Sequence, residues 1–203
     1  MIRFVTSLAV VGLLAACAPN AGDDASVERV AAAAYQAPGP NTLTIFTMVN
    51  NRTGAGGHTS LMVNGSQRVI FDPAGSFRDP RMAERADVLY GVTPGWLQAY
   101  KSAHARASFH VVSQEIVVTQ AQAERAMQLV RANGPVAGAF CANSTTNLLR
   151  QVPGFEGIKT TFYPVKFMEQ LEAMPGVTTT RYYENDEGDV IDALRAAQLA
   201  KTL

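Results

Sequence analysis

Residues 57–72 read GHTSLMVNGSQRVIFD. Asn-Gly-Ser at 64–66 separates two runs that are rich in apolar and β-branched residues. An Asn-Gly step between such runs is a strong signal for a hairpin of two antiparallel strands. The stretch therefore predicts a hairpin that carries His58 near its start and Asp72 at its end.

The length of the turn decides whether His58 and Asp72 share a face of this hairpin. A three-residue connection at 64–66 places the two residues directly opposite each other on one face. A two-residue turn, which Asn-Gly favours, pairs His58 with Phe71 and sends Asp72 to the other face. Asp72 is also typical of a residue that starts a turn, here before Pro73. The sequence leaves these alternatives open.

Strand and helix patterns mix along the rest of the chain without strict alternation. Patterns typical of strands cover 42–49, 87–92, 108–118 and 177–183, while patterns typical of helices follow Thr93-Pro94, cover 120–133, begin near Cys141 and cover 164–174. The helix over 120–133 has a capping-box pattern before it and the clearest periodicity. This mixing favours an α+β fold, in which an antiparallel sheet packs against helices, over a doubly wound parallel sheet.

Composition limits the number of domains and the class of partner. The chain has 203 residues with 17 basic and 17 acidic side chains. It has no basic stripe, so nucleic acid is not an expected partner. The sequence predicts a leader over 1–16, a lipidated cysteine with a flexible tether over 17–41, a single domain over 42–186 and a C-terminal helix over 187–203. The tether prediction rests on a composition rich in Ala, Gly, Pro and Asp.

The N-terminal sequence is typical of an exported protein. Arg3 precedes an apolar run, 4–14, that is too short to span a bilayer. Leu-Ala-Ala-Cys at 14–17 resembles the processing box of bacterial lipoproteins, which implies that Cys17 is acylated and that the membrane is a partner through this lipid. By the same resemblance, Ala18 after the cysteine favours the outer membrane of a Gram-negative cell. An ordinary cleaved signal peptide or a retained anchor is the alternative.

Cys141 is the one other cysteine of the chain, so it has no expected disulfide partner. An unpaired cysteine in an exported protein is a candidate for a chemical role. Cys141 follows a loop with two glycines and a proline, 134–139, and precedes a predicted helix. Unpaired N–H groups at a helix start lower the pKa of a thiol and can stabilise an oxyanion. The alternative is a cysteine buried as a small apolar side chain.

His58 is the best candidate for a base that takes the proton of Cys141. It follows a glycine-rich run, 54–57, that would let a substrate approach closely. Such a base is usually oriented by a third polar group, and Asp72 is the candidate. A histidine in a satisfied surface or core position is the alternative. His104 ends a helix pattern and His110 lies in a strand pattern, and both are weaker candidates.

Metal and phosphate chemistry have little support in the sequence. The three histidines are scattered, and a single thiol cannot build a common zinc site. The glycine run at 54–57 lacks the Gly-Lys-Ser/Thr ending of a phosphate-binding loop. We therefore predict no metal and no cofactor.

Three features together resemble a known family. They are His58 in a Gly-His-Thr-Ser hairpin, a polar residue that ends the partner strand, and a later cysteine that opens a helix. This pattern resembles the circularly permuted branch of the NlpC-type papain-like superfamily, which includes the lecithin:retinol acyltransferase-like proteins. The resemblance covers roughly residues 42–175. It implies a permuted papain-like fold with Cys141 as nucleophile, His58 as general base and Asp72 as orienting residue.

The resemblance also implies a class of reaction. Members of the superfamily transfer acyl groups through a thioester, from amides or esters. The third position in these enzymes is often His, Asn or Gln, and here it is Asp72. The expected function is an envelope lipoprotein with a cysteine hydrolase or acyltransferase domain that acts on peptidoglycan peptide or on lipid. The alternative is a non-catalytic binding or scaffold lipoprotein, with Trp96, 162–163 and 182–183 as an aromatic recognition surface.

Overall fold

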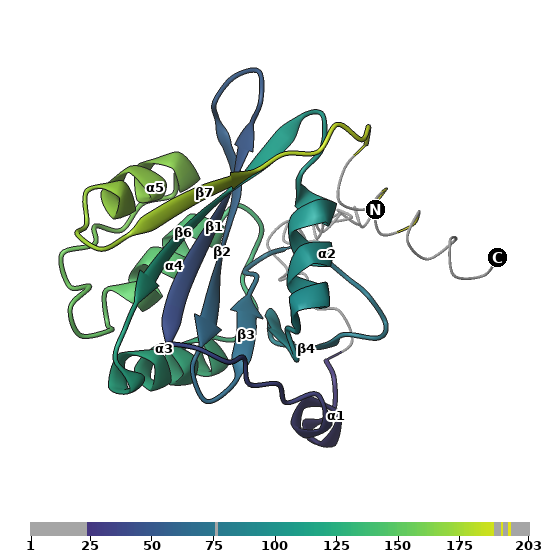
Figure 1. Ribbon diagram of the computed structural model, residues 1–203, viewed down its shortest axis with the longest axis vertical. Coiled ribbons are helices and arrows are strands. Elements are labelled where there is room, and N and C mark those ends of the chain that lie inside the picture. The colour runs from purple at the N-terminus through teal and green to yellow at the C-terminus, as the bar shows by residue number, and fades with distance from the viewer. Residues whose placement is uncertain (1–23, 76, 189–191, 193–194, 196–203) are drawn as a thin grey trace, which may run out of the picture.

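The computed structural model describes residues 24–75, 77–188, 192 and 195. Its described residues form one antiparallel sheet of seven strands in the order β4-β5-β3-β2-β1-β6-β7 (Figure 1). The strands are β1 (Thr42–Asn50), β2 (Gly56–Asn64), β3 (Arg68–Phe71), β4 (Ala83–Arg85), β5 (Val88–Tyr90), β6 (Phe109–Val117) and β7 (Thr178–Tyr182). The helices are α1 (Val27–Ala32), α2 (Pro94–His104), α3 (Gln120–Ala132), α4 (Cys141–Leu149) and α5 (Pro164–Glu172). The predicted α+β class, with an antiparallel sheet packed against helices, is confirmed.

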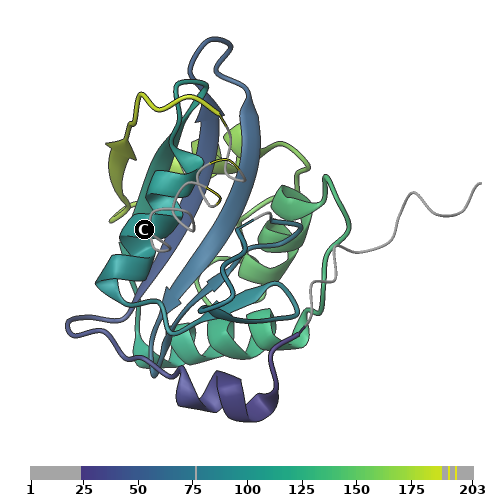
Figure 2. The ribbon, with the colours of Figure 1, turned by 90° about the vertical axis from the view of Figure 1, so that its right-hand side faces the viewer.

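Helices cover both faces of the sheet, and each face has its own core. Side chains alternate along β1, so Leu43 and Ile45 enter one core while Phe46 and Met48 enter the other. The first core holds apolar side chains of α3, α4 and α5, and the second holds those of α2. Figure 2 shows α2 on one side of the sheet, with α3 and α4 on the other. The sheet therefore separates α2 from the helix that starts at Cys141.

The hairpin of β2 and β3 has a register that neither predicted turn gives. Asn64 pairs with Arg68 and Leu61 with Phe71, so the connection consists of residues 65–67. This register is shifted by two residues from the predicted three-residue turn. Because side chains alternate along a strand, a register shift of two residues leaves every side chain on the same face of the hairpin. Asp72 therefore emerges on the face of His58, although the register brings it level with Ser60.

The predicted flexible tether is wrong for residues 24–41, which pack against the domain. The N–H of Ala25 donates to the carbonyl of Glu84, and the N–H of Arg68 donates to the carbonyl of Tyr35. Ala25 and Ala37 are buried. The sequence conceals this because α1 has six residues, too few to show a helical period. The segment is instead held by backbone hydrogen bonds, which the amino-acid composition does not reveal.

Both ends of the chain extend beyond the described residues. The predicted leader, 1–16, and Cys17 lie outside them, as does most of the predicted C-terminal helix, 187–203. Among the described residues, no helix combines the length and the apolar character that crossing a bilayer requires.

Candidate active site

The candidate site lies where β2 extends beyond its neighbour β3. Pairing with β3 covers 61–64, so the start of β2 has no strand on that side among the described residues. The first turn of α4 occupies this open edge, where the backbone N–H of Thr59 helps to lower the pKa of the Cys141 thiol. His58, the preceding residue, lies close enough to lower this pKa as well. The structure thus brings together the predicted nucleophile and the predicted base.

The loop before α4 leaves the start of the helix available to the sulfur. Phe140 is the N-cap residue, and its side chain makes no capping hydrogen bond. Ala139 has a φ of 68°, so the chain turns sharply just before the helix. The backbone N–H of Ala142 also helps to lower the pKa of the Cys141 thiol. A helix start in this arrangement favours a thiolate.

The site lowers the pKa of Cys141 and raises the pKa of His58. Burial raises the pKa of the Cys141 thiol, but the hydrogen bond and charge of His58, with the two backbone N–H groups, outweigh burial and lower this pKa. Burial also lowers the pKa of His58, but Asp72 and then Cys141 outweigh it and raise the pKa to about 10. Both shifts favour a thiolate beside an imidazolium over a neutral thiol beside a neutral imidazole.

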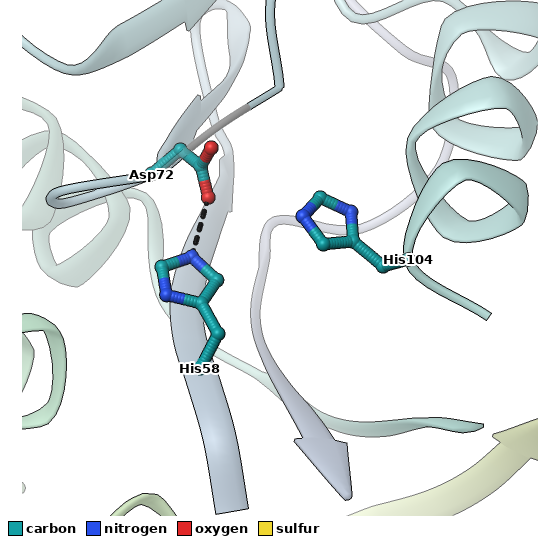
Figure 3. Close-up of side chains that lie close together, drawn as sticks. All are labelled: His58, Asp72 and His104. Atoms are coloured by element: carbon teal, nitrogen blue, oxygen red, sulfur yellow. Dashed lines mark hydrogen bonds and ion pairs between the residues drawn. The ribbon is translucent and has the colours of Figure 1, made fainter. Parts of the chain in front are cut away.

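Asp72 orients the imidazole of His58. Its Oδ1 lies 2.8 Å from Nε2 of His58 (Figure 3), and its side chain is 1% exposed. Burial raises the pKa of Asp72, but the charge and hydrogen bond of His58 lower it, so the pKa falls to about 2. Because Nε2 faces Asp72, Nδ1 is the nitrogen that remains for Cys141.

Tyr100 and Ser60 support Asp72, although neither was predicted to have a role in the site. The hydroxyl of Tyr100 lies 2.5 Å from Oδ1 of Asp72 and 2.8 Å from Oγ of Ser60. A hydroxyl has one proton, so Tyr100 donates to the carboxylate and accepts from Ser60. Gly75 closes the other side, because a Cβ there would lie 1.9 Å from Oδ2 of Asp72.

His104 is the second histidine of the site, although the sequence ranked it as a weak candidate. Its ring stacks on that of His58, with centroids 6.0 Å apart and planes 13° apart. Its Nδ1 lies 2.8 Å from the carbonyl oxygen of Tyr100. Burial lowers the pKa of His104 to about 4, so its ring is neutral at neutral pH. His110 lies elsewhere, stacked on Tyr183 at 4.5 Å.

His58, Asp72 and His104 are the side chains best placed to hold a metal ion among the described residues. One ligand atom from each lies within 4.8 Å of the other two. The facing atoms of His58 and Asp72 already form a hydrogen bond of 2.8 Å. A cation would have to displace the proton of that bond, so the arrangement is that of an acid–base network.

Exposed aromatic side chains flank the nucleophile. Phe140, directly before Cys141, is 45% exposed, and Phe162 is 51% exposed. Their rings meet edge to face with centroids 5.3 Å apart. Tyr163 and Tyr183, which the sequence also predicted as a possible recognition surface, are exposed as well. Two further members of that predicted surface, Trp96 and Tyr182, are instead partly buried against the core beneath α2.

Comparison with known proteins gives no match. No family model, no curated protein and no solved structure is significantly similar to the chain.

Proposed function

We propose that the chain is a cysteine-dependent acyl hydrolase or acyltransferase with a permuted papain-like fold, which acts on an amide or ester through a thioester. One observation carries the proposal: at the open edge of β2, Asp72 hydrogen-bonds to His58, and the imidazole of His58 lies close enough to Cys141 to lower the pKa of its thiol. The chain order, with the histidine strand before the cysteine helix, supports the permuted form of the fold. In such an arrangement an imidazole activates a thiol while a carboxylate orients the imidazole.

The first half of the reaction forms the thioester. The sulfur of Cys141 attacks the carbonyl carbon of the substrate, and the carbonyl π electrons move onto oxygen. The backbone N–H of Ala142, at the start of α4, is available to that oxyanion. Nδ1 of His58 then gives its proton to the departing nitrogen or oxygen as the bond to the acyl carbon breaks. Cys141 is left acylated and His58 neutral.

The second half releases the acyl group. Neutral His58 takes a proton from a water molecule or another hydroxyl or amine as that nucleophile attacks the thioester. Collapse of the tetrahedral intermediate expels the thiolate of Cys141, and the imidazolium is restored. Asp72 stays ionised throughout, because its pKa of about 2 lies far below neutral pH. The cycle consumes one acyl acceptor and needs no cofactor.

We also propose that the enzyme is lipid-anchored at Cys17 in the cell envelope, on the periplasmic face of the outer membrane. The support is the N-terminal lipoprotein pattern at 14–18. A position at this membrane would bring both peptidoglycan peptide and lipid within reach as substrates.

The rate of thiol alkylation against pH tests the proposed chemistry. A thiolate that is already formed at neutral pH reacts faster than a model thiol there. We expect Cys141 to react with iodoacetamide at pH 6–7 on the order of tenfold faster than free cysteine. His58→Gln should remove this advantage, and His110→Gln, which changes the half-buried histidine stacked on Tyr183, should leave it intact. A Cys141 that reacts no faster than free cysteine would defeat the proposal.

The exposed aromatic side chains favour a second candidate, a non-catalytic binding or scaffold lipoprotein. Phe140, Phe162 and Tyr163 are large exposed apolar side chains, and the rings of Phe140 and Phe162 are in contact. In this case a partner would bind these aromatic side chains, and the Cys141 thiol would take part in no reaction. Cys141→Ala distinguishes the two candidates in the native cell. A phenotype that matches deletion of the gene supports the enzyme, whereas an unchanged phenotype supports the scaffold.

A further inference from the structure

Asp72 lies between two imidazoles but is bonded to only one of them. Its Oδ1 accepts from His58 and Tyr100, whereas its Oδ2 is buried and has no hydrogen-bond partner among the described residues. Figure 3 shows His104 reaching from α2 with a ring nitrogen turned toward Asp72. The ligand atoms of the three side chains lie within 4.8 Å of one another.

The hydrogen bond of Nδ1 fixes the tautomer of His104. A carbonyl oxygen can only accept, so Nδ1 must carry a proton to bond to the carbonyl of Tyr100. Nε2 of the neutral ring therefore carries a bare lone pair. It is this nitrogen that faces Asp72, because Nδ1 is turned back to its own helix. A proton on Nε2 would give the carboxylate a second cationic neighbour.

The charges around His104 decide when Nε2 can hold that proton. Burial opposes protonation of Nε2, the carboxylate of Asp72 favours it, and the imidazolium of His58 opposes it. Arg106, in the turn after α2, also opposes it, although Arg106 is itself paired with Asp186 at 3.0 Å. The largest contribution that changes during a reaction is the charge of His58. When His58 becomes neutral, Asp72 loses its counter-ion and His104 is the basic group beside it.

We propose that His58 and His104 share Asp72 as a common counter-ion and hold one proton between them, on His58 at rest and on His104 while His58 is neutral. This inference rests on the proposed function, because His58 becomes neutral when it protonates the leaving group. Nε2 of His104 then takes a proton from solvent water. When the acyl acceptor returns a proton to His58, His104 gives its own back to solvent, so the cycle has no net gain or loss.

Histidine titration by NMR tests the shared proton without any turnover. The Cε1–H resonances of His58, His104 and His110 are followed against pH in the wild type and in His58→Gln. We expect the pKa of His104 to rise by about one unit or more in the variant, the coupling typical of groups that share a site. His110, which stacks on Tyr183 away from the site, serves as the internal control and should titrate identically in both proteins. An unchanged His104 overturns the inference.

A second variant keeps the test decisive if His58→Gln does not fold. Asp72→Asn removes the shared counter-ion, so the pKa of His104 should fall below its wild-type value. A value that stays the same or rises overturns the inference. His104→Asn adds a kinetic readout, because its amide can still donate to the carbonyl of Tyr100 but has no atom at Nε2. We expect kcat for ester hydrolysis to fall several-fold with KM little changed.

The shared proton and the proposed function fail in different ways. If Cys141 is alkylated no faster than free cysteine but the pKa of His104 changes in His58→Gln, the enzyme proposal fails and the shared counter-ion stands. If Cys141 is alkylated fast but the pKa of His104 is the same in His58→Gln, the enzyme proposal stands and the shared proton is overturned.

Discussion

At the scale of residues, the protons of His58 and Cys141 set how stability depends on pH. The folded pair keeps its proton on His58 up to about pH 10, whereas Cys141 ionises below its ordinary pKa. From about pH 6.5 upward the unfolded chain loses the histidine proton that the folded state keeps, and this lowers stability as pH rises. The lowered pKa of Cys141 offsets part of this decline below about pH 8.5, because the folded thiol ionises at lower pH than the unfolded one. Above about 8.5 the folded state holds a proton that the unfolded state has lost, and stability declines as pH rises toward 10.

Removing the thiol should make this decline steeper. In Cys141→Ala no thiol offsets the effect of His58, which alone makes the folded state bind more protons from about pH 6.5 upward. We expect the free energy of unfolding, measured in urea, to fall more steeply from about pH 7 to about 8.5 in the variant than in the wild type. Cys141→Ser should behave as Cys141→Ala does. Parallel curves for all three proteins would mean that the native thiol is not ionised.

The sequence could predict the reactive residues of the site but not their supports. Cys141 and His58 carry signals of their own, since one opens a helix and the other follows a glycine run in a strand. Tyr100 and His104 look like any inward-facing residues of an amphipathic helix. Their role depends on where α2 crosses the hairpin, which no local pattern encodes. The position of Asp72 depended on a turn at 65–67 that the statistics of Asn-Gly do not favour.

At the scale of elements, the site depends on close contact between the start of β2 and the start of α5. Gly56 lies against α5, and a Cβ at this position would come within 2.7 Å of Cβ of Pro164 and 3.0 Å of the backbone nitrogen of Val165. These atoms belong to backbone or to a rigid ring, so they cannot move aside without shifting the helix. The sequence shows a run of glycines at 54–57, but only the packing reveals which of them needs to be glycine.

Gly56→Ala should therefore destabilise the fold and disturb the site. We expect a loss of about 1–3 kcal/mol in the free energy of unfolding, the usual cost of overpacking. Thiol alkylation at neutral pH should slow as well, because the displaced strand carries His58. Gly157→Ala is the matched control, since nothing lies within 4 Å of a Cβ there. Equal stability of the two variants, measured by urea unfolding, would contradict the packing argument.

At the scale of the whole molecule, the N-terminal segment is part of the domain. Residues 24–37 supply backbone partners to Glu84 in β4 and Arg68 in β3. The side chain of Arg29 also donates to the carbonyl of Met82 at 3.1 Å. These bonds hold the edge of the sheet that adjoins the strand of Asp72. Composition predicted a tether here because short polar and small residues look alike whether or not they are bound.

Truncation distinguishes a bound segment from a tether. A protein that begins at Gly39 loses both backbone hydrogen bonds and should unfold more easily than one that begins at Asp24, by about 1 kcal/mol for each bond lost. The comparison uses urea unfolding of the two truncated proteins. If the Asp24 and Gly39 proteins are equally stable, residues 24–38 contribute nothing to stability and act as a tether.

The docking of Cys141 at the bare edge of β2 has a consequence for biosynthesis. A ribosome makes the chain from its N-terminus, so the histidines, the carboxylate and the tyrosine all exist before the sulfur does. Until α4 docks on the bare edge of β2, the cysteine has neither the imidazolium nor the amide of Thr59 beside it. The lowered pKa of its thiol is therefore acquired only on folding, so the nascent chain carries an ordinary, less nucleophilic cysteine.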